Sequence, residues 1–391
     1  MFSNRFNFDQ SQNNISKLLD NKKKSGVTIY DLTESNPTQA GFIYDENSIM
    51  NSLSGKEILT YNPHPKGIRQ ARNSIFDYYK EQNVNIHSDS IFITSGTSES
   101  YSHLIKLLTN PGDEILIHKP GYPLLEFITE IENVKLSFYD LIYNYISGWQ
   151  IDFDSLKNAI SKNTKAIVII NPNNPTGSFI KQEEIIKLNI IAKENELALI
   201  SDEVFFDFKD SENIYSSFAD NNHSLTFTLN GLSKICALPQ MKMSWIIVNG
   251  QAKIKNEAIY KLEIINDTFL SAGTPIQLAS ATLLKNRINI QNQIMKRIIN
   301  NYSILEKIIH NNSIVKLLKR EAGWYAVLKI NDNIEDEERA YMLLDKFNVY
   351  IHPGYFFNFE DDGYIVLSLI TKEKIFRKGI ELLFSEFPII I

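Results

Sequence analysis

The chain has 391 residues, of which 43% are hydrophobic and 22% are charged, and its formal net charge is −6. A chain of this length exceeds one ordinary hydrophobic core, so we expect two domains, or one large domain with a smaller partner. The acidic balance provides no long-range attraction for nucleic acid or for anionic lipid.

Disulfides and secretion signals are also not expected. Cys236 is the single cysteine, and we interpret it as a core residue rather than a nucleophile, because no histidine follows nearby. Residues 1–6 contain no apolar stretch long enough for a signal peptide. Apolar runs such as 166–170 are far shorter than the roughly 20 residues that a membrane helix needs. We therefore expect a cytoplasmic protein that binds no membrane.

Short apolar runs alternate with amphipathic segments from about residue 86 to residue 250. The expected strands are 91–94, 114–118, 134–138, 166–170, 197–201, 225–229 and 244–248, and the helices between them include 98–108, 154–160 and 181–195. This alternation predicts an α/β domain with a mainly parallel seven-stranded sheet and helices on both faces. Ligands of such sheets bind beyond the carboxyl ends of the strands.

A long helical stretch follows from about residue 250 to residue 309, and a second α/β pattern ends the chain. Its expected strands are 324–330, 349–352 and 365–369. We expect residues 46–275 to form the large domain. Residues 1–45 and 276–391 are expected to form a small domain with an N-terminal arm, completed by the segment 29–45.

Polar loops follow four of the expected strands. The first, Ser95-Gly96-Thr97, opens a helix, where free backbone N–H groups bind anions such as phosphate. The alternative is an ordinary helix cap, because Ser or Thr followed by Glu is a common helix start. The second loop, 171–177, contains Asn-Pro twice; it is either a turn or a source of amide ligands such as Asn174.

The other two loops carry Asp202 and Lys234. A lone carboxylate at a strand end suits a pyridinium nitrogen, which it keeps protonated. No metal site is expected, because no histidine or third carboxylate nearby completes a ligand set. A lysine is usually a surface residue, but one that follows a buried strand becomes a Schiff-base amine when its pKa is lowered. None of the four loops by itself indicates one class of protein, whereas their order and spacing together do.

In this order the loops resemble those of fold type I enzymes that use pyridoxal 5′-phosphate (PLP), and within them the class I and II aminotransferases. The resemblance extends from about residue 31 to residue 369. It implies that Lys234 holds PLP as a Schiff base and that Asp202 pairs with its ring nitrogen. Further cofactor contacts are implied for Tyr61, Ser95, Gly96, Thr97, Tyr122, Asn174 and Ser233.

The resemblance also implies particular roles for three of these residues. Tyr122 stacks on the pyridine ring, and Asn174 hydrogen-bonds the phenolic oxygen. Tyr61 reaches the phosphate of a neighbouring subunit, which implies a homodimer. The segments Thr274-Pro275-Ile276-Gln277 and Gly323-Trp324 also lie where the family has similar sequences.

The chain departs from the family pattern at four positions. Phe205 replaces a tyrosine on the phenolic oxygen, and Lys242 replaces an arginine on the phosphate. Val366 stands where an arginine usually clamps the α-carboxylate of the substrate, and Ser35 replaces a glycine at the same carboxylate. Since an arginine fork makes two charged hydrogen bonds and valine makes none, the substrate site is expected to be atypical.

We expect the substrate site to include Ser35, Asn36, Tyr122, Asn174, Tyr355 and Val366. The aromatic residues of the segment 351–357 either contribute to the mouth of this site or only pack the small domain. The usual clamp would not be missing if the C-terminal motif is aligned wrongly, or if another arginine binds the carboxylate. Arg287 and Arg320 are the first candidates for such an arginine.

The implied function is amino-group transfer between an amino acid or amine and a 2-oxo acid, with Lys234 also moving the α-proton. A PLP-dependent lyase or cyclase acting by β- or γ-elimination would use the same fold and cofactor residues. A PLP-sensing regulator is less favoured. About 28 residues precede the first family segment, too few for a helix-turn-helix domain, and no basic recognition helix appears.

Overall fold

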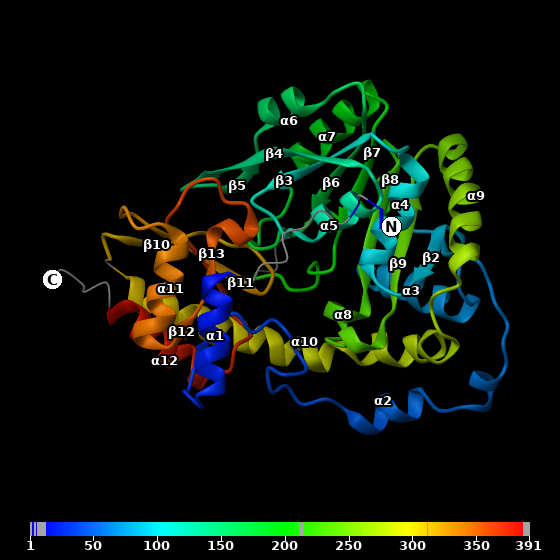
Figure 1. The fold of residues 1–391 in the computed structure, drawn as a ribbon. Helices are drawn as coiled ribbons and strands as arrows, with labels where there is room; N and C mark the ends of the chain where they lie inside the picture. The colour runs from blue at the N-terminus through cyan, green and yellow to red at the C-terminus, as the bar shows by residue number, and fades with distance from the viewer. Residues whose placement is uncertain (1, 4, 6–12, 211–214, 311, 386–391) are drawn as a thin grey trace.

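The computed structural model describes residues 2–3, 5, 13–210, 215–310 and 312–385 (Figure 1). Most of the first residues, for which the sequence predicts no signal peptide, lie outside this part. Within the described ranges, no helix has the length and apolar character needed to cross a membrane.

The large sheet has eight strands in the order β2-β9-β8-β7-β6-β3-β4-β5. They are β2 (Ile91–Thr94), β3 (Glu114–Lys119), β4 (Lys135–Asn144), β5 (Gly148–Ile151), β6 (Thr164–Ile170), β7 (Ala198–Asp202), β8 (Thr226–Gly231) and β9 (Ser244–Asn249). Only β9 and β5 run antiparallel to their neighbours. The α/β class and the seven expected strands are confirmed. The expectation of seven strands was one too few, because β5 forms a hairpin with β4 and is only four residues long.

Helices cover both faces of this sheet, as Figure 1 shows. They are α3 (Arg69–Glu81), α4 (Thr97–Leu108), α5 (Leu124–Ile131), α6 (Phe153–Ala159), α7 (Gln182–Glu194), α8 (Leu232–Ile235) and α9 (Ala252–Phe269). Short 3-10 helices lie at Lys56–Leu59, Ser88–Ser90, Phe218–Asp220, Pro239–Met241 and Gly354–Phe357. The central strands are buried along their whole length, which explains their continuous apolar sequences.

The small sheet has the order β10-β11-β14-β13 and is antiparallel at each described pairing. Its strands are β10 (Val315–Leu317), β11 (Tyr325–Ile330), β13 (His352–Pro353) and β14 (Tyr364–Ser368). The expected strand 349–352 is in fact two, β12 (Val349–Tyr350) and β13, because only β12 pairs with β1 (Tyr30–Asp31). The short strand β10 was not predicted.

The remaining helices are α1 (Asn14–Lys24), α2 (Glu46–Ser52), α10 (Thr274–Ile309), α11 (Asp336–Phe347) and α12 (Glu373–Ser385). The helix α10 runs beneath both sheets in Figure 1. It begins one residue before the expected end of the large domain at residue 275 and continues through the small domain. The domain boundaries stay a prediction.

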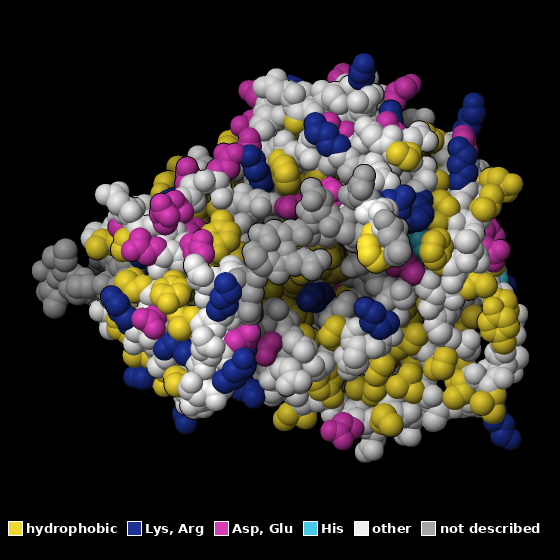
Figure 2. Space-filling model, in the orientation of Figure 1, with side chains coloured by type: hydrophobic (Ala, Val, Ile, Leu, Met, Phe, Trp, Pro, Cys, Tyr) yellow, Lys and Arg dark blue, Asp and Glu magenta, His cyan; other side chains and the backbone are white. Residues whose placement is uncertain are grey.

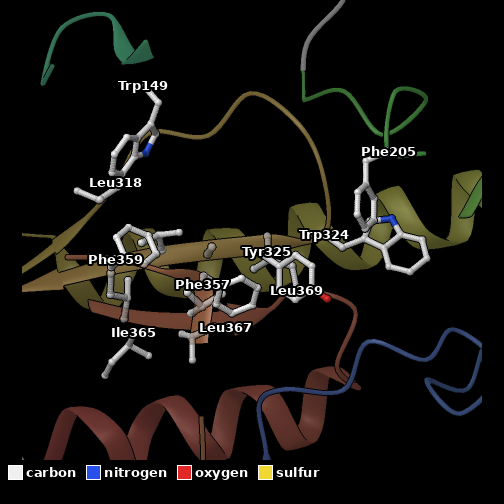
Figure 3. Packing of buried hydrophobic residues seen from close by; sticks show 14 of the residues in the cluster. Trp149, Phe205, Leu318, Trp324, Tyr325, Phe357, Phe359, Ile365, Leu367 and Leu369 are labelled. Atoms are coloured by element: carbon white, nitrogen blue, oxygen red, sulfur yellow. The ribbon is translucent and has the colours of Figure 1, made fainter. Parts of the chain in front are cut away.

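Strand register decides which side chains of the small sheet share a face. Val366 is paired with Val327 on β11 and with His352 on β13, and Ser368 is paired with Tyr325. Residues directly opposite one another in antiparallel strands lie on the same face. These five side chains therefore share one face, and Leu367 and Ile365 point to the other, as Figure 3 shows for Leu367 and Tyr325.

Candidate functional site

The site lies at the carboxyl ends of β6, β7 and β8. The Asn171 N–H donates to the Asp202 carbonyl at 2.8 Å, and the Glu203 N–H donates to the Leu229 carbonyl at 2.8 Å. These backbone bonds continue the parallel ladder past the strand ends. They therefore bring the loop 171–177, Asp202 and the segment leading to Lys234 together, as the sequence predicts.

The Lys234 ammonium lies over two aromatic rings. Its Nζ lies 4.8 Å from the centre of the Trp324 ring and 5.2 Å from the centre of the Phe205 ring, and Figure 3 shows these two rings side by side. Desolvation lowers the pKa of Lys234 to about 8, and the charge of Asp202 partly opposes this. A lysine with a lowered pKa has a larger neutral fraction and reacts more readily as an amine.

Asp202 is a buried carboxylate with two hydrogen-bond donors. The Tyr101 hydroxyl donates to its Oδ2 at 3.0 Å, and the Val204 N–H donates to its Oδ1 at 3.1 Å. Burial raises the pKa of Asp202 to about 6, while these two bonds and the charge of Lys234 lower it. At neutral pH the carboxylate is therefore largely ionised and able to pair with a protonated ring nitrogen.

The predicted phosphate turn lies at the start of α4. Both the N–H and the hydroxyl of Ser95 donate to Glu99, at 2.7 and 3.1 Å, but the N-cap residue is Gly96 and no side chain caps the helix. A Cβ built on Gly96 would meet a single atom within 4 Å, Nζ of Lys242 at 4.0 Å. The structure thus brings Lys242 to the space in front of Gly96 and Thr97, where helix α4 begins.

His118 connects the loops that carry Tyr122 and Asn174. The Ile170 N–H donates to its Nε2 at 3.2 Å, and its Nδ1 lies 3.1 Å from the Pro120 carbonyl. Burial lowers the pKa of His118 to about 4, so the ring is neutral and donates from Nδ1 while it accepts at Nε2. Tyr122 is half-exposed, whereas the amide oxygen of Asn174 is buried without a partner among the described residues.

The structure places two further predicted cofactor residues, Tyr61 and Ser233, as follows. Tyr61 is 77% exposed and lines a surface hollow with Asn266 and Gln277, at α9 and α10. Ser233 is partly buried and lies next to Lys234 in α8.

The expected substrate residues gather on the small sheet and the segment beside it. The Ser368 hydroxyl donates to the Glu34 carbonyl at 2.5 Å, which holds Ser35 next to β14. Asn36 accepts hydrogen bonds from Thr38 through its side-chain oxygen, at 3.1 and 2.7 Å. Tyr355 is partly exposed and packs against Phe356, with 4.9 Å between ring centres.

Val366 is completely buried, so its side chain is not available to a ligand in this structure. The two arginines considered as substitutes are engaged elsewhere. Arg287 pairs with Glu81 at 2.7 Å, and Arg320 pairs with Asp210 at 2.8 Å. The structure therefore places neither of them at this position.

These residues fit PLP. Asp202 suits the ring nitrogen, the amide NH2 of Asn174 is a donor that suits the phenolic oxygen, and the Gly96 cradle with Lys242 suits a phosphate. Phe205 is buried against Trp324, with 5.3 Å between ring centres, and brings no hydroxyl. The site is that of a fold type I enzyme for a phosphorylated pyridine aldehyde.

Comparison with known proteins agrees with this assignment. The family model "Aminotransferase class I and II" matches residues 32–377. The chain therefore belongs to the class I and II aminotransferases, whose members use PLP. In structure it is similar to an alanine aminotransferase from Pyrococcus furiosus, with a TM-score of 0.89, 23% identity and 99% of each chain covered.

Two curated relatives match over part of their length. The chain is 30% identical to nicotianamine aminotransferase 1 of Oryza sativa subsp. japonica over 261 residues, which are 65% of this chain and 51% of that protein. It is 29% identical to glutamate-pyruvate aminotransferase AlaA of Escherichia coli over 267 residues, which are 67% of this chain and 65% of that protein. The chain thus spans between half and two thirds of the length of these relatives.

Three residues with a place in this site were missed by the sequence interpretation: Tyr101, His118 and Tyr325. Tyr101 lies one helical turn after Thr97, a spacing that puts it on the same face of α4. His118 is a polar residue at the end of a buried strand, directly before the loop that carries Tyr122. Both signals were present in the sequence, whereas the position of Tyr325 depends on the packing of the small sheet.

Proposed function

We propose that the protein is an aminotransferase that moves an amino group between an amino acid or amine and a 2-oxo acid, with Lys234 as the catalytic residue. The observation that carries this proposal is the meeting of Lys234 and Asp202 at one sheet edge. There the pKa of the lysine is lowered to about 8 and the buried carboxylate remains ionised at neutral pH. The family membership supports the same reaction.

When bound, PLP supplies an aldehyde that condenses with amines and a ring that accepts electrons. Lys234 would hold the cofactor through its amine and, when that amine is free, would move the proton of the substrate α-carbon. Asp202 would keep the ring nitrogen protonated, and Tyr101 and the Val204 N–H orient its carboxylate. The rings of Phe205 and Trp324 cover one side of the Lys234 ammonium.

The substrate end of the site is proposed to lack the usual carboxylate clamp. Val366 is buried between Val327 and His352. Burial lowers the pKa of His352 to about 4, so this neighbour is neutral at pH 7 and supplies no positive charge. Small dicarboxylic amino acids are therefore proposed to be poor substrates, although glutamate appears in the name of one relative.

A homodimer is proposed from the exposed apolar surface near Tyr61. Leu59, Met50 and Phe269 are 83%, 67% and 49% exposed, and Figure 2 shows hydrophobic side chains gathered over α2 and α10 at the lower right. Patches of this kind mark protein–protein interfaces. A monomer that is fully active at the concentration of a light-scattering measurement would contradict this assembly.

One experiment tests the reaction class. The purified protein with PLP is mixed with single amino acids and amines, and both the cofactor and the solution are analysed after one turnover. Amino-group transfer leaves pyridoxamine 5′-phosphate on the protein, whereas elimination regenerates PLP and releases ammonia. Ammonia release without pyridoxamine 5′-phosphate would replace the aminotransferase assignment with the lyase or cyclase alternative.

A further inference from the structure

His118 lies near the carboxyl end of β3 and is buried, with 2% of its surface exposed. Strand β3 is paired with β6, and the Ile170 N–H at the end of β6 donates to His118 Nε2 at 3.2 Å. Because Nε2 accepts this bond, the neutral ring carries its proton on Nδ1 and donates it to the Pro120 carbonyl, 3.1 Å away. One side chain therefore joins the ends of two neighbouring strands, where the loops of Tyr122 and Asn174 begin.

The peptide unit between Pro120 and Gly121 is held on both sides. Its carbonyl accepts hydrogen bonds from His118 and from the Asn173 amide, at 3.1 Å each. Its N–H donates to the Phe357 carbonyl at 2.8 Å. A peptide unit is planar, so these three contacts together fix the direction in which the chain leaves Gly121. They come from three parts of the molecule: the end of β3, the loop after β6 and the segment after β13.

The backbone of this loop packs directly against the imidazole ring. A Cβ at position 121 would lie 2.9 Å from the His118 carbonyl oxygen and 3.5 Å from its Cε1 and Nδ1 atoms. The imidazole also packs edge-to-face with the buried Tyr139 ring, with 5.9 Å between ring centres. The ring of His118 therefore has little freedom to move, and the loop that lies against it shares this restriction.

We propose that His118 is a positioning residue for Tyr122: it fixes the Pro120–Gly121 peptide and thereby holds the Tyr122 ring in place to stack on the pyridine ring of PLP. Tyr122 is 47% exposed, so the packing of its own side chain restrains it little. A ring that is already in place does not have to be ordered when PLP binds, and binding is stronger by that amount. The inference rests on the proposed function, because it names a further residue of the same site.

A double-mutant cycle between positions 118 and 122 tests this inference. The dissociation constant of PLP is measured by equilibrium dialysis for native protein, His118→Leu, Tyr122→Ala and the double variant. His118→Leu removes one donor to the Pro120 carbonyl and should raise the constant about fivefold, the size of one neutral hydrogen bond. In the Tyr122→Ala background the same substitution should change the constant less than about twofold, because the positioned ring is absent.

Two conservative variants separate the two hydrogen bonds of His118. An asparagine amide reaches the place of Nδ1 and retains a donor for the Pro120 carbonyl, whereas a glutamine amide reaches the place of Nε2 and retains an acceptor for the Ile170 N–H. His118→Asn should therefore bind PLP nearly as tightly as native protein, and His118→Gln should resemble His118→Leu. His118→Gln also replaces His118→Leu in the cycle if the leucine variant does not fold.

Tyr139→Phe is the matched control. The Tyr139 hydroxyl donates to the Val168 carbonyl inside β6 at 3.1 Å, so the substitution removes a buried hydrogen bond beside His118 but leaves the contacts of the Pro120 carbonyl unchanged. Its dissociation constant for PLP should equal that of native protein. Hydrogen exchange of the cofactor-free proteins gives a second readout: peptides that cover residues 119–123 should exchange faster in His118→Leu and at the native rate in Tyr139→Phe.

Three results would each overturn the inference. They are an equal effect of His118→Leu with and without Tyr122, native hydrogen exchange over residues 119–123 in His118→Leu, and tighter PLP binding by His118→Gln than by His118→Asn. These measurements do not depend on the reaction that follows cofactor binding. The proposed function fails separately, if native protein with PLP releases ammonia from its substrate and forms no pyridoxamine 5′-phosphate.

Discussion

The two faces that meet at Lys234 differ in how closely they follow the family pattern. On the side of the large sheet, Asp202, Asn174 and Lys234 meet at one sheet edge, and Lys242 lies before the Gly96 turn, as expected for a cofactor site. On the side of the small sheet, we expect Val366 to stand in place of the clamping arginine. We therefore propose an ordinary use of the cofactor and an unusual choice of substrate. The predictions below test each half separately.

The largest effect is expected from Lys234→Ala. Native protein treated with borohydride should carry the cofactor covalently on Lys234, and the variant should not. Turnover should fall by about 10⁴-fold or more, because a covalent anchor and a general acid–base are lost together. Peptide mapping by mass spectrometry checks the attachment point. Cofactor trapped on another lysine would refute the assignment of the cofactor half.

Val366 tests the substrate half. Native protein should have a kcat/KM for aspartate and glutamate that is roughly 10 to 100 times lower than for bulky amines, because no charged fork holds their α-carboxylate. Val366→Arg should narrow this gap, provided that circular dichroism shows an unchanged fold. Efficient transamination of glutamate by native protein would show that another group binds the carboxylate.

Asp202, on the cofactor side of the site, is expected to make the stability of the folded protein depend on pH. Its pKa is raised to about 6, above the value of about 3.9 in an unfolded chain, so the folded state binds the proton more tightly. This contribution to stability is complete below pH 4 and is lost as the pH rises through 6. Without cofactor, Asp202→Asn should therefore be more stable than native protein at pH 8 by about 2 kcal/mol, and nearly equal to it at pH 4. Urea unfolding at both pH values measures this, and a variant that is less stable at pH 8 would contradict it.

Phe205 is expected to have a smaller effect, confined to the cofactor. A tyrosine hydroxyl would donate a hydrogen bond to the phenolic oxygen of PLP and favour the ionised form of that oxygen. One such bond contributes about 1 kcal/mol, which corresponds to a change of less than one unit in the pKa of the chromophore. The visible chromophore on Lys234 should therefore titrate at a higher pH in native protein than in Phe205→Tyr. A spectroscopic titration of both proteins decides this, and a reversed order would count against the expected position of the ring.

The smallest effect is expected from Lys242→Arg. A guanidinium makes paired bonds to a phosphate, whereas an ammonium acts as a point charge. The substitution should lower the dissociation constant of PLP a few-fold if Lys242 faces the phosphate. Equilibrium dialysis measures the change, with Lys253→Arg on the exposed surface of α9 as control. Weaker binding in Lys242→Arg would mean that the compact ammonium is needed in front of Gly96.

Much of the cofactor half could be read from the sequence, because each of its parts is local. Asp202 and Lys234 directly follow buried strands, and neighbouring parallel strands end at one edge of the sheet, so a correct strand assignment already brings these residues together. The same reasoning predicted the loop of Asn174 and the start of α4. It missed β5 and β10, whose three or four residues give too little periodicity to detect.

The substrate half was decided by contacts between residues far apart in the chain. Glu34 meets Ser368 across more than 300 residues, and Lys242 approaches Gly96 only because β9 and β2 are paired. The sequence by itself led to the prediction that position 366 lacks the usual arginine. Only the tertiary structure decided that Val366 is buried and that Arg287 and Arg320 are engaged elsewhere. The physical reason is that sequence patterns set the faces of strands and helices, whereas strand register and packing decide which of those faces meet.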